Sequence, residues 1–70
     1  MNLYTEIVKR GIPHSNHYSD LYLPDTAEVR DLCRQCDVRP TTFVNQVEGG
    51  IWLDCPFQYL PYWEAKAAHL

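Results

Sequence analysis

Two pairs of side chains have the spacing of metal ligands or of a redox dithiol. Cys33 and Cys36 form a C-x-x-C pair, and His14 and His17 form an H-x-x-H pair. Thiolates and imidazoles bind zinc, and a C-x-x-C pair can also act as a redox dithiol. A redox thiol is activated at a helix N-terminus, whereas these cysteines fall near the C-terminal end of a predicted helix, on its apolar side. We therefore expect core cysteines and predict neither a cofactor nor a metal. A small zinc or thiol module is the alternative.

The cysteine count also indicates a compartment. The chain has three cysteines, and an odd number argues against a closed disulfide framework and for a reducing environment. We therefore expect a cytoplasmic protein.

Acids and bases for catalysis are present, but no catalytic motif joins them. Asp20, Asp54, His14 and His17 are the candidates. The sequence contains no nucleophile elbow, no phosphate-binding glycine loop and no recognisable triad. A chain this short also has difficulty enclosing a substrate pocket. We predict that the protein is not an enzyme.

Acidic residues gather in the middle of the chain. They are Asp20, Asp25, Glu28, Asp31 and Asp37. An acidic surface can meet a basic nucleic-acid-binding groove and occupy the positions of phosphates. Arginines are interleaved with these carboxylates, so an ordinary solvated helix face is the alternative interpretation.

Aromatic residues offer a second kind of contact surface. They make up 13% of the chain, and in a small domain most of them must lie in the core. Tyr and Trp are enriched at binding hot spots. The densest aromatic segment is 57–63, and we expect Tyr59 and Tyr62 to serve as exposed anchors.

Length and charge limit the fold and the partners. Seventy residues, of which 46% are hydrophobic, suit one compact domain spanning residues 1–70. The net charge of −3 disfavours direct binding to nucleic acid or to an anionic membrane. No apolar run is long enough to span a bilayer, and no signal-peptide pattern is present.

Hydrophobic periodicity predicts two helices in the first half of the chain. Residues 2–10 place Leu3 and Ile7 on one side, with Asn2 as the cap. Residues 26–36 form the clearer helix, because Asp25 and Glu28 have capping-box spacing. The apolar stripe of that helix consists of Val29, Leu32, Cys33 and Cys36. Residues 14–19 are predicted to be irregular.

The remaining segments predict strands and a final helix. Residues 20–23 form a short strand, and residues 41–47 and 51–55 form a hairpin around a Glu-Gly-Gly turn. We expect Trp52 on one face and the following residues on the other: Phe43, Val47, Ile51, Leu53 and Cys55. Pro61 begins a helix over 62–69. The prediction is an α+β fold, ordered α-β-α-β-β-α, with a small three-stranded, mainly antiparallel sheet and about three short helices.

Four segments resemble a group of short phage- and prophage-encoded proteins. They are HYSDLY at 17–22, TF at 42–43, GIWLDCPF at 50–57 and PYWE at 61–64. The resemblance covers about the whole chain. This sequence has Gly49 where the group usually has Asp, and Cys55 where a branched apolar residue is usual. Both differences are compatible with a hairpin.

Small acidic proteins of this kind are similar to anti-CRISPR inhibitors, which bind a CRISPR-Cas surveillance complex stoichiometrically. The resemblance implies a monomer or weak dimer in the cytoplasm of an infected bacterium. Its expected mode of action is to block target DNA through an acidic surface with aromatic anchors. The expected contact residues are Asp20, Asp25, Glu28, Asp31, Tyr59 and Tyr62. The alternative is another small phage accessory or regulatory protein-binding module.

Overall fold

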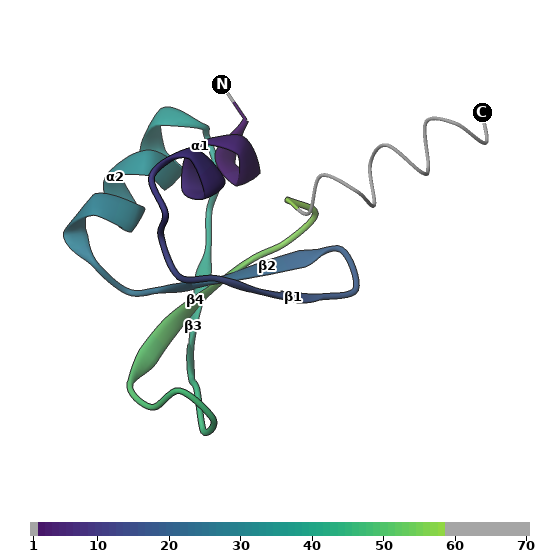
Figure 1. Cartoon of the computed structure of the whole chain (residues 1–70), viewed down its shortest axis with the longest axis vertical. Coiled ribbons are helices and arrows are strands. Elements are labelled where there is room, and N and C mark those ends of the chain that lie inside the picture. The colour runs from purple at the N-terminus through teal and green to yellow at the C-terminus, as the bar shows by residue number, and fades with distance from the viewer. Residues whose placement is uncertain (1, 59–70) are drawn as a thin grey trace.

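Two helices lie on one side of a four-stranded antiparallel sheet in the computed structural model, which describes residues 2–58 (Figure 1). The elements are α1 (Leu3–Lys9), β1 (Ser15–His17), β2 (Asp20–Pro24), α2 (Ala27–Gln35), β3 (Thr41–Val44) and β4 (Ile51–Cys55). The strand order is β1-β2-β4-β3. The α+β class is confirmed, but the sheet has four strands rather than three. The helix predicted over 62–69 lies outside the described residues.

The first helix forms as the sequence predicts. The Asn2 side chain accepts a hydrogen bond from the backbone N–H of Thr5 at 3.0 Å, which satisfies one of the free donors of the first turn. Leu3 and Ile7 are buried on the side that faces the sheet. Gly11, at φ 65°, follows the last turn, where a residue without Cβ is favoured.

The second helix has a different cap from the predicted one. The side chain of Thr26, not that of Asp25, accepts the N–H of Val29 at 3.2 Å. Thr26 has the extended backbone of an N-cap. The Asp25 carboxylate is instead held by the Arg30 guanidinium in a two-point contact. The capping box predicted from Asp25 and Glu28 is therefore wrong by one residue.

Substitution of Thr26 tests this cap. Thr26→Ala is expected to lower the free energy of unfolding by about 1 kcal/mol, because a helix donor loses its acceptor. Asp25→Ala is expected to cost less, since an exposed ion pair contributes little. Urea unfolding of both variants measures the two losses of unfolding free energy. A larger loss in Asp25→Ala would show that Asp25 is the N-cap.

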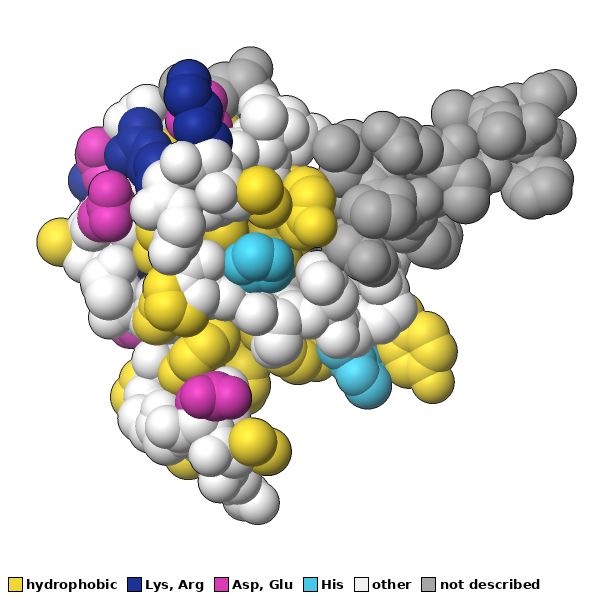
Figure 2. Space-filling view, in the orientation of Figure 1, with side chains coloured by type: hydrophobic (Ala, Val, Ile, Leu, Met, Phe, Trp, Pro, Cys, Tyr) yellow, Lys and Arg dark blue, Asp and Glu magenta, His cyan; other side chains and the backbone are white. Residues whose placement is uncertain are grey.

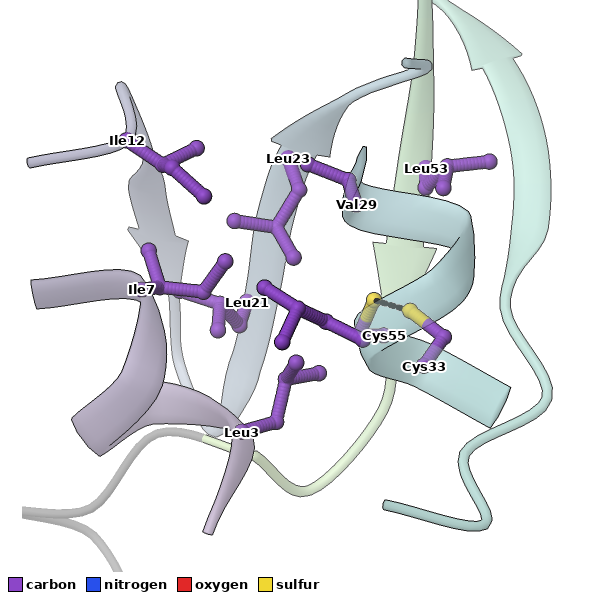
Figure 3. Packing of buried hydrophobic residues seen from close by; sticks show 10 residues of the cluster. Leu3, Ile7, Ile12, Leu21, Leu23, Val29, Cys33, Leu53 and Cys55 are labelled. Carbon is purple, nitrogen blue, oxygen red and sulfur yellow. Dashed lines mark hydrogen bonds between the residues drawn. The ribbon is translucent and has the colours of Figure 1, made fainter. Parts of the chain in front are cut away.

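The core lies between the helices and the two central strands (Figure 3). Cys33 is buried there as predicted, and its Sγ lies 3.9 Å from the Sγ of Cys55 on β4, both as free thiols. Cys36 is half-buried and packs against the edge of the cluster. The core residues are Leu3, Ile7, Ile12, Leu21, Leu23, Val29, Leu32, Cys33, Leu53 and Cys55.

The strand β1 was not predicted. Its three residues are all polar and exposed, so the sequence has no alternation of apolar and polar side chains that would predict a strand there. The strand exists because it pairs with β2, with Ser15 opposite Tyr22 and His17 opposite Asp20. Residues 14–19 therefore contain a regular strand, which corrects the prediction of an irregular segment.

The register of the β3–β4 hairpin also differs from the predicted one. Phe43 lies opposite Trp52 and therefore shares its face, rather than that of Leu53 and Cys55. The cause is the turn, which spans residues 45–50 instead of only the Glu-Gly-Gly segment. The change in register is an odd number of residues, so every side chain of β3 moves to the other face.

Asn45 organises this longer turn and thereby shields Trp52. The Asn45 side chain accepts the N–H groups of Val47 and Glu48 at 3.0 and 2.8 Å. The turn lies close enough for Trp52 Nε1–H to donate to the carbonyl of Gly49 at 3.2 Å. Trp52 is only 8% exposed, although it lies on the face of the sheet that the helices do not cover.

Within residues 2–58, no helix is both long enough and apolar enough to cross a membrane.

Candidate functional site

The face of the sheet turned away from α1 and α2 carries an unusual set of side chains, and we call it the open face. Strand pairing and alternation assign its members. No helix of residues 2–58 covers it (Figure 1). The residues of the open face are Ser15, His17, Asp20, Tyr22, Pro24, Thr41, Phe43, Trp52 and Asp54.

Three rings form a row across the open face. The His17 ring is stacked on that of Tyr22, with centroids 5.9 Å apart, and Tyr22 contacts Phe43 at 4.7 Å. Tyr18 adds an edge-on ring beside His17 at 4.7 Å and is 86% exposed. The row therefore crosses from β1 to β3 and joins both edges of the sheet. Its rings present amphipathic surface to solvent at little conformational cost.

A hollow of about 420 Å³ lies beside this row. It is lined by Ser15, Tyr22 and Phe43 and by residues 44–48 at the end of β3. Figure 2 shows the molecule hollowed between the β1–β2 and β3–β4 hairpins, with hydrophobic side chains on both. The hollow is shallow and open, which suits a side chain of a partner rather than an enclosed small molecule.

Two carboxyl groups stand next to the ring row. Asp54 lies directly opposite Tyr22, and Asp20 is its diagonal neighbour on the same face. Asp54 Oδ1 is shielded from solvent and has no hydrogen-bond partner within residues 2–58. Burial, and then proton sharing with Asp20, raises the pKa of Asp54, while His17 opposes the shift. Burial and these two carboxylates raise the pKa of Tyr22 as well.

The acidic residues predicted on α2 are each paired with arginine. Arg30 holds Asp25 and lowers its pKa, and Arg34 with Gln35 does the same for Asp31. Glu28 accepts a hydrogen bond from Arg10, the C-cap of α1, at 3.4 Å. Basic and acidic side chains are accordingly mixed over the helices in Figure 2. The helix surface offers little uncompensated negative charge.

The structure separates the predicted contact residues into two regions. Asp20 belongs to the open face, whereas Asp25, Glu28 and Asp31 lie on the helix side. Tyr59 and Tyr62 lie outside the described residues. The anchors missed at the sequence level are His17, Tyr22 and Phe43. Sequence alternation over 20–24 was a usable signal for Tyr22, but the face of Phe43 depended on the turn.

The C-x-x-C and H-x-x-H pairs do not meet in a ligand set. Cys33 points into the core toward Cys55, and His14 bonds the Ile12 carbonyl through Nδ1 at 2.9 Å. His17 belongs to the ring row. Within the part of the chain that the structure describes, no group of three or more His, Cys, Asp or Glu side chains could hold a metal ion.

Comparison with known proteins finds no matching family model, no similar curated protein and no similar solved structure.

Proposed function

We propose that the protein is a small binding module, without catalysis of its own, that holds a basic segment of a protein partner on the open face. The observation that carries this proposal is the juxtaposition of the ring row with the carboxyl groups of Asp20 and Asp54. Rings supply apolar contact, and the carboxylates select a cation.

An arginine or lysine side chain fits both features. Its charged end is attracted to the faces of aromatic rings and to carboxylates, while its methylene stem packs against apolar surface. A partner cation beside Asp20 and Asp54 would also relieve the repulsion between the two carboxylates. Binding is therefore expected to favour the ionised form of both groups.

The open face is a better candidate than the acidic surface of α2. On α2, a partner would have to displace Arg30 from Asp25 and Arg34 from Asp31 before it gained either carboxylate. On the open face, Asp20 and Asp54 have no arginine or lysine partner within residues 2–58. A partner cation would therefore not have to displace an arginine or lysine to approach this carboxyl pair.

The resemblance to phage-encoded inhibitors supports a specific partner, a CRISPR-Cas surveillance complex in the cytoplasm of an infected bacterium. Lysine and arginine side chains line the surfaces that hold target DNA in such complexes. A basic segment of that kind, held on the open face, would be blocked from DNA. The module would then act stoichiometrically, as a competitor of the target.

Binding to a panel of surveillance complexes, each with and without target DNA, tests the partner. Nanomolar binding that target DNA abolishes is the expected result. Binding that target DNA does not change would support this partner but reject competition with DNA. Absence of binding across the panel would reject this partner and favour another phage accessory or regulatory target for the same face.

The face itself is tested by substitution, independently of the partner. His17→Ala and Asp20→Asn are each expected to weaken binding about tenfold, because one removes a ring and the other a charge. Asp37→Asn is the matched control, since Asp37 is exposed beyond the end of α2 and is expected to leave affinity unchanged. Without a natural partner, an oligo-arginine peptide is the probe, and NMR shift changes should centre on Tyr22 and Phe43. Shift changes confined to α2 would assign binding to the helices instead.

A further inference from the structure

We infer that the free edge of β3 pairs with the β3 edge of a second copy of this chain, in an antiparallel register centred on Phe43. This inference concerns the edge of the sheet and does not rest on the proposed function, although Phe43 also belongs to the open face.

The direction of each backbone group on β3 follows from one hydrogen bond. Asn45 N–H donates to the carbonyl of Gly50 at 3.0 Å, and these residues continue the β3–β4 register. Hydrogen-bonded and non-hydrogen-bonded pairs alternate along an antiparallel ladder. Thr41 and Phe43 therefore bond to β4, whereas the N–H and C=O groups of Thr42 and Val44 point away from the sheet.

The β2–β4 ladder supports the same assignment. Asp25 N–H donates to the carbonyl of Ile51, so the groups of Ile51 and Leu53 face β2. Those of Trp52 and Asp54 must then face β3, which requires Phe43 and Thr41 as their partners. The outward groups of Thr42 and Val44 are left without a partner within residues 2–58.

Although β3 is short and follows Pro40, it lacks the charges and bulges that normally prevent strand addition. Natural edge strands are protected by charged residues, proline, bulges or short length. Thr41 to Val44 contains no charge, and Val44 is 66% exposed. The opposite edge, β1, has three residues, and only Asn16 among them presents outward backbone groups, because Ser15 and His17 bond to β2. Strand addition is therefore expected at β3.

The outward groups select one register for a second copy. With Phe43 opposite its own copy, Thr42 of each chain faces Val44 of the other, and these two residues exchange both of their hydrogen bonds. Shifting the centre to Thr42 would place Val44 opposite Pro40, which has no N–H. Shifting it to Val44 would place Thr42 opposite Gln46 in the turn. Only the register centred on Phe43 uses all the outward groups of both copies.

Side chains near the edge favour the same occupant. The two Phe43 rings would lie directly opposite each other on the open face, as a non-hydrogen-bonded pair with close Cβ atoms. Antiparallel pairing also brings Arg39 of each copy to the segment that carries Glu48 of the other. Arg39 and Glu48 are both exposed, and neither forms an ion pair within residues 2–58. The edge is thus complementary to itself in charge as well as in hydrogen bonding.

The expected dimer is weak, because strand-to-strand contact over four residues is a small interface. Sedimentation velocity of the full chain should show the dimer fraction increasing between about 10 µM and about 1 mM. A single monomeric species at the highest concentration would overturn the inference.

Thr42→Pro removes an N–H that only the dimer uses. Proline is tolerated on an edge strand where its nitrogen faces solvent, so the thermal unfolding midpoint should change little. The variant is expected to remain monomeric at concentrations where the wild type dimerises. Thr42→Val, which retains the N–H, is the matched control and should dimerise as the wild type does. Dimerisation that survives in Thr42→Pro would overturn pairing through this edge.

Disulfide trapping tests the register even if Thr42→Pro fails to fold. The cysteine variants are made in a Cys36→Ser background, in which the two remaining native thiols, Cys33 and Cys55, are buried. Phe43→Cys then places one thiol of each copy beside the two-fold axis of the dimer, at a separation that a disulfide can span. Its oxidation to a covalent dimer is expected to be at least about tenfold faster than that of Val44→Cys, which faces Thr42 instead. Equal rates for the two variants would overturn the register centred on Phe43.

Discussion

Leu53→Ala is expected to leave much of the protein unfolded at room temperature. Leu53 is fully buried on β4 (Figure 3), at the centre of the sheet. Truncation of a buried leucine costs about 2–5 kcal/mol, because the lost contacts leave a cavity. A core of this size supplies only about 3–5 kcal/mol of net stability. Far-UV circular dichroism against urea measures the loss.

Ile51→Ala provides the matched control for that experiment. Ile51 lies two residues from Leu53 on the same strand and the same side of the sheet, but it is 50% exposed beyond the helices. Its truncation is expected to cost less than about 1 kcal/mol. A similar loss in both variants would mean that the projecting end of the β3–β4 hairpin shares the core, contrary to the burial described above.

The pair also illustrates what a sequence pattern can and cannot determine. Alternation alone treats Ile51 and Leu53 alike, because both occupy the same face of one strand. Burial separates them, because Leu53 belongs to the core cluster with Val29 and Leu32 of α2, whereas Ile51 is 50% exposed. Local signals correctly predicted α1, α2, β2 and β4, where caps, prolines or apolar spacing act within a few residues. Features that depend on contacts between segments distant in the sequence were harder to predict from local signals.

The two errors in the sheet share this origin. Strand β1 carries no apolar side chain in its three residues and is defined by its partner β2. The face of Phe43 depends on the turn, where Asn45 caps the backbone of Val47 and Glu48. The glycines at 49 and 50 suggested a tighter turn, and the buried asparagine that lengthens it had no recognised signal.

The candidate site shows the same division. The acidic character of the segment 25–31 was visible in the sequence, but its neutralisation depends partly on Arg10, which comes from another helix. Asp20 was identified as a contact residue on the basis of charge. The sequence indicates its neighbour Asp54 only as a candidate acid or base, because sheet pairing, rather than sequence proximity, brings the two carboxyl groups together.

That carboxyl pair leads to the second large expected effect. Asp54→Asn should stabilise the protein at pH 7 by about 1–3 kcal/mol, the cost of a buried acceptor without a partner. Asp54 Oδ1 is such a buried acceptor without a partner within residues 2–58. Ionisation of Asp54 also places a negative charge beside Asp20. Asparagine keeps the shape of the side chain, removes the charge and can donate to Asp20.

The pH dependence gives the sign of the effect. The folded protein holds the Asp54 proton more tightly than the unfolded chain does, since the pKa of Asp54 is raised. Stability from this group is therefore complete below the ordinary carboxyl pKa and is lost as pH rises through the raised value. The pKa values of Asp25 and Asp31 are lowered, so their contributions are lost as pH falls. Wild-type stability should peak at mildly acidic pH.

Urea unfolding from pH 3 to pH 8 distinguishes the two contributions. In Asp54→Asn, the decline above the peak is expected to flatten, while the decline on the acidic side remains because Asp25 and Asp31 are unchanged. Asp37→Asn, at an exposed position, should reproduce the wild-type profile. Destabilisation of Asp54→Asn at pH 7 would show that the ionised carboxylate is stabilising in the folded protein.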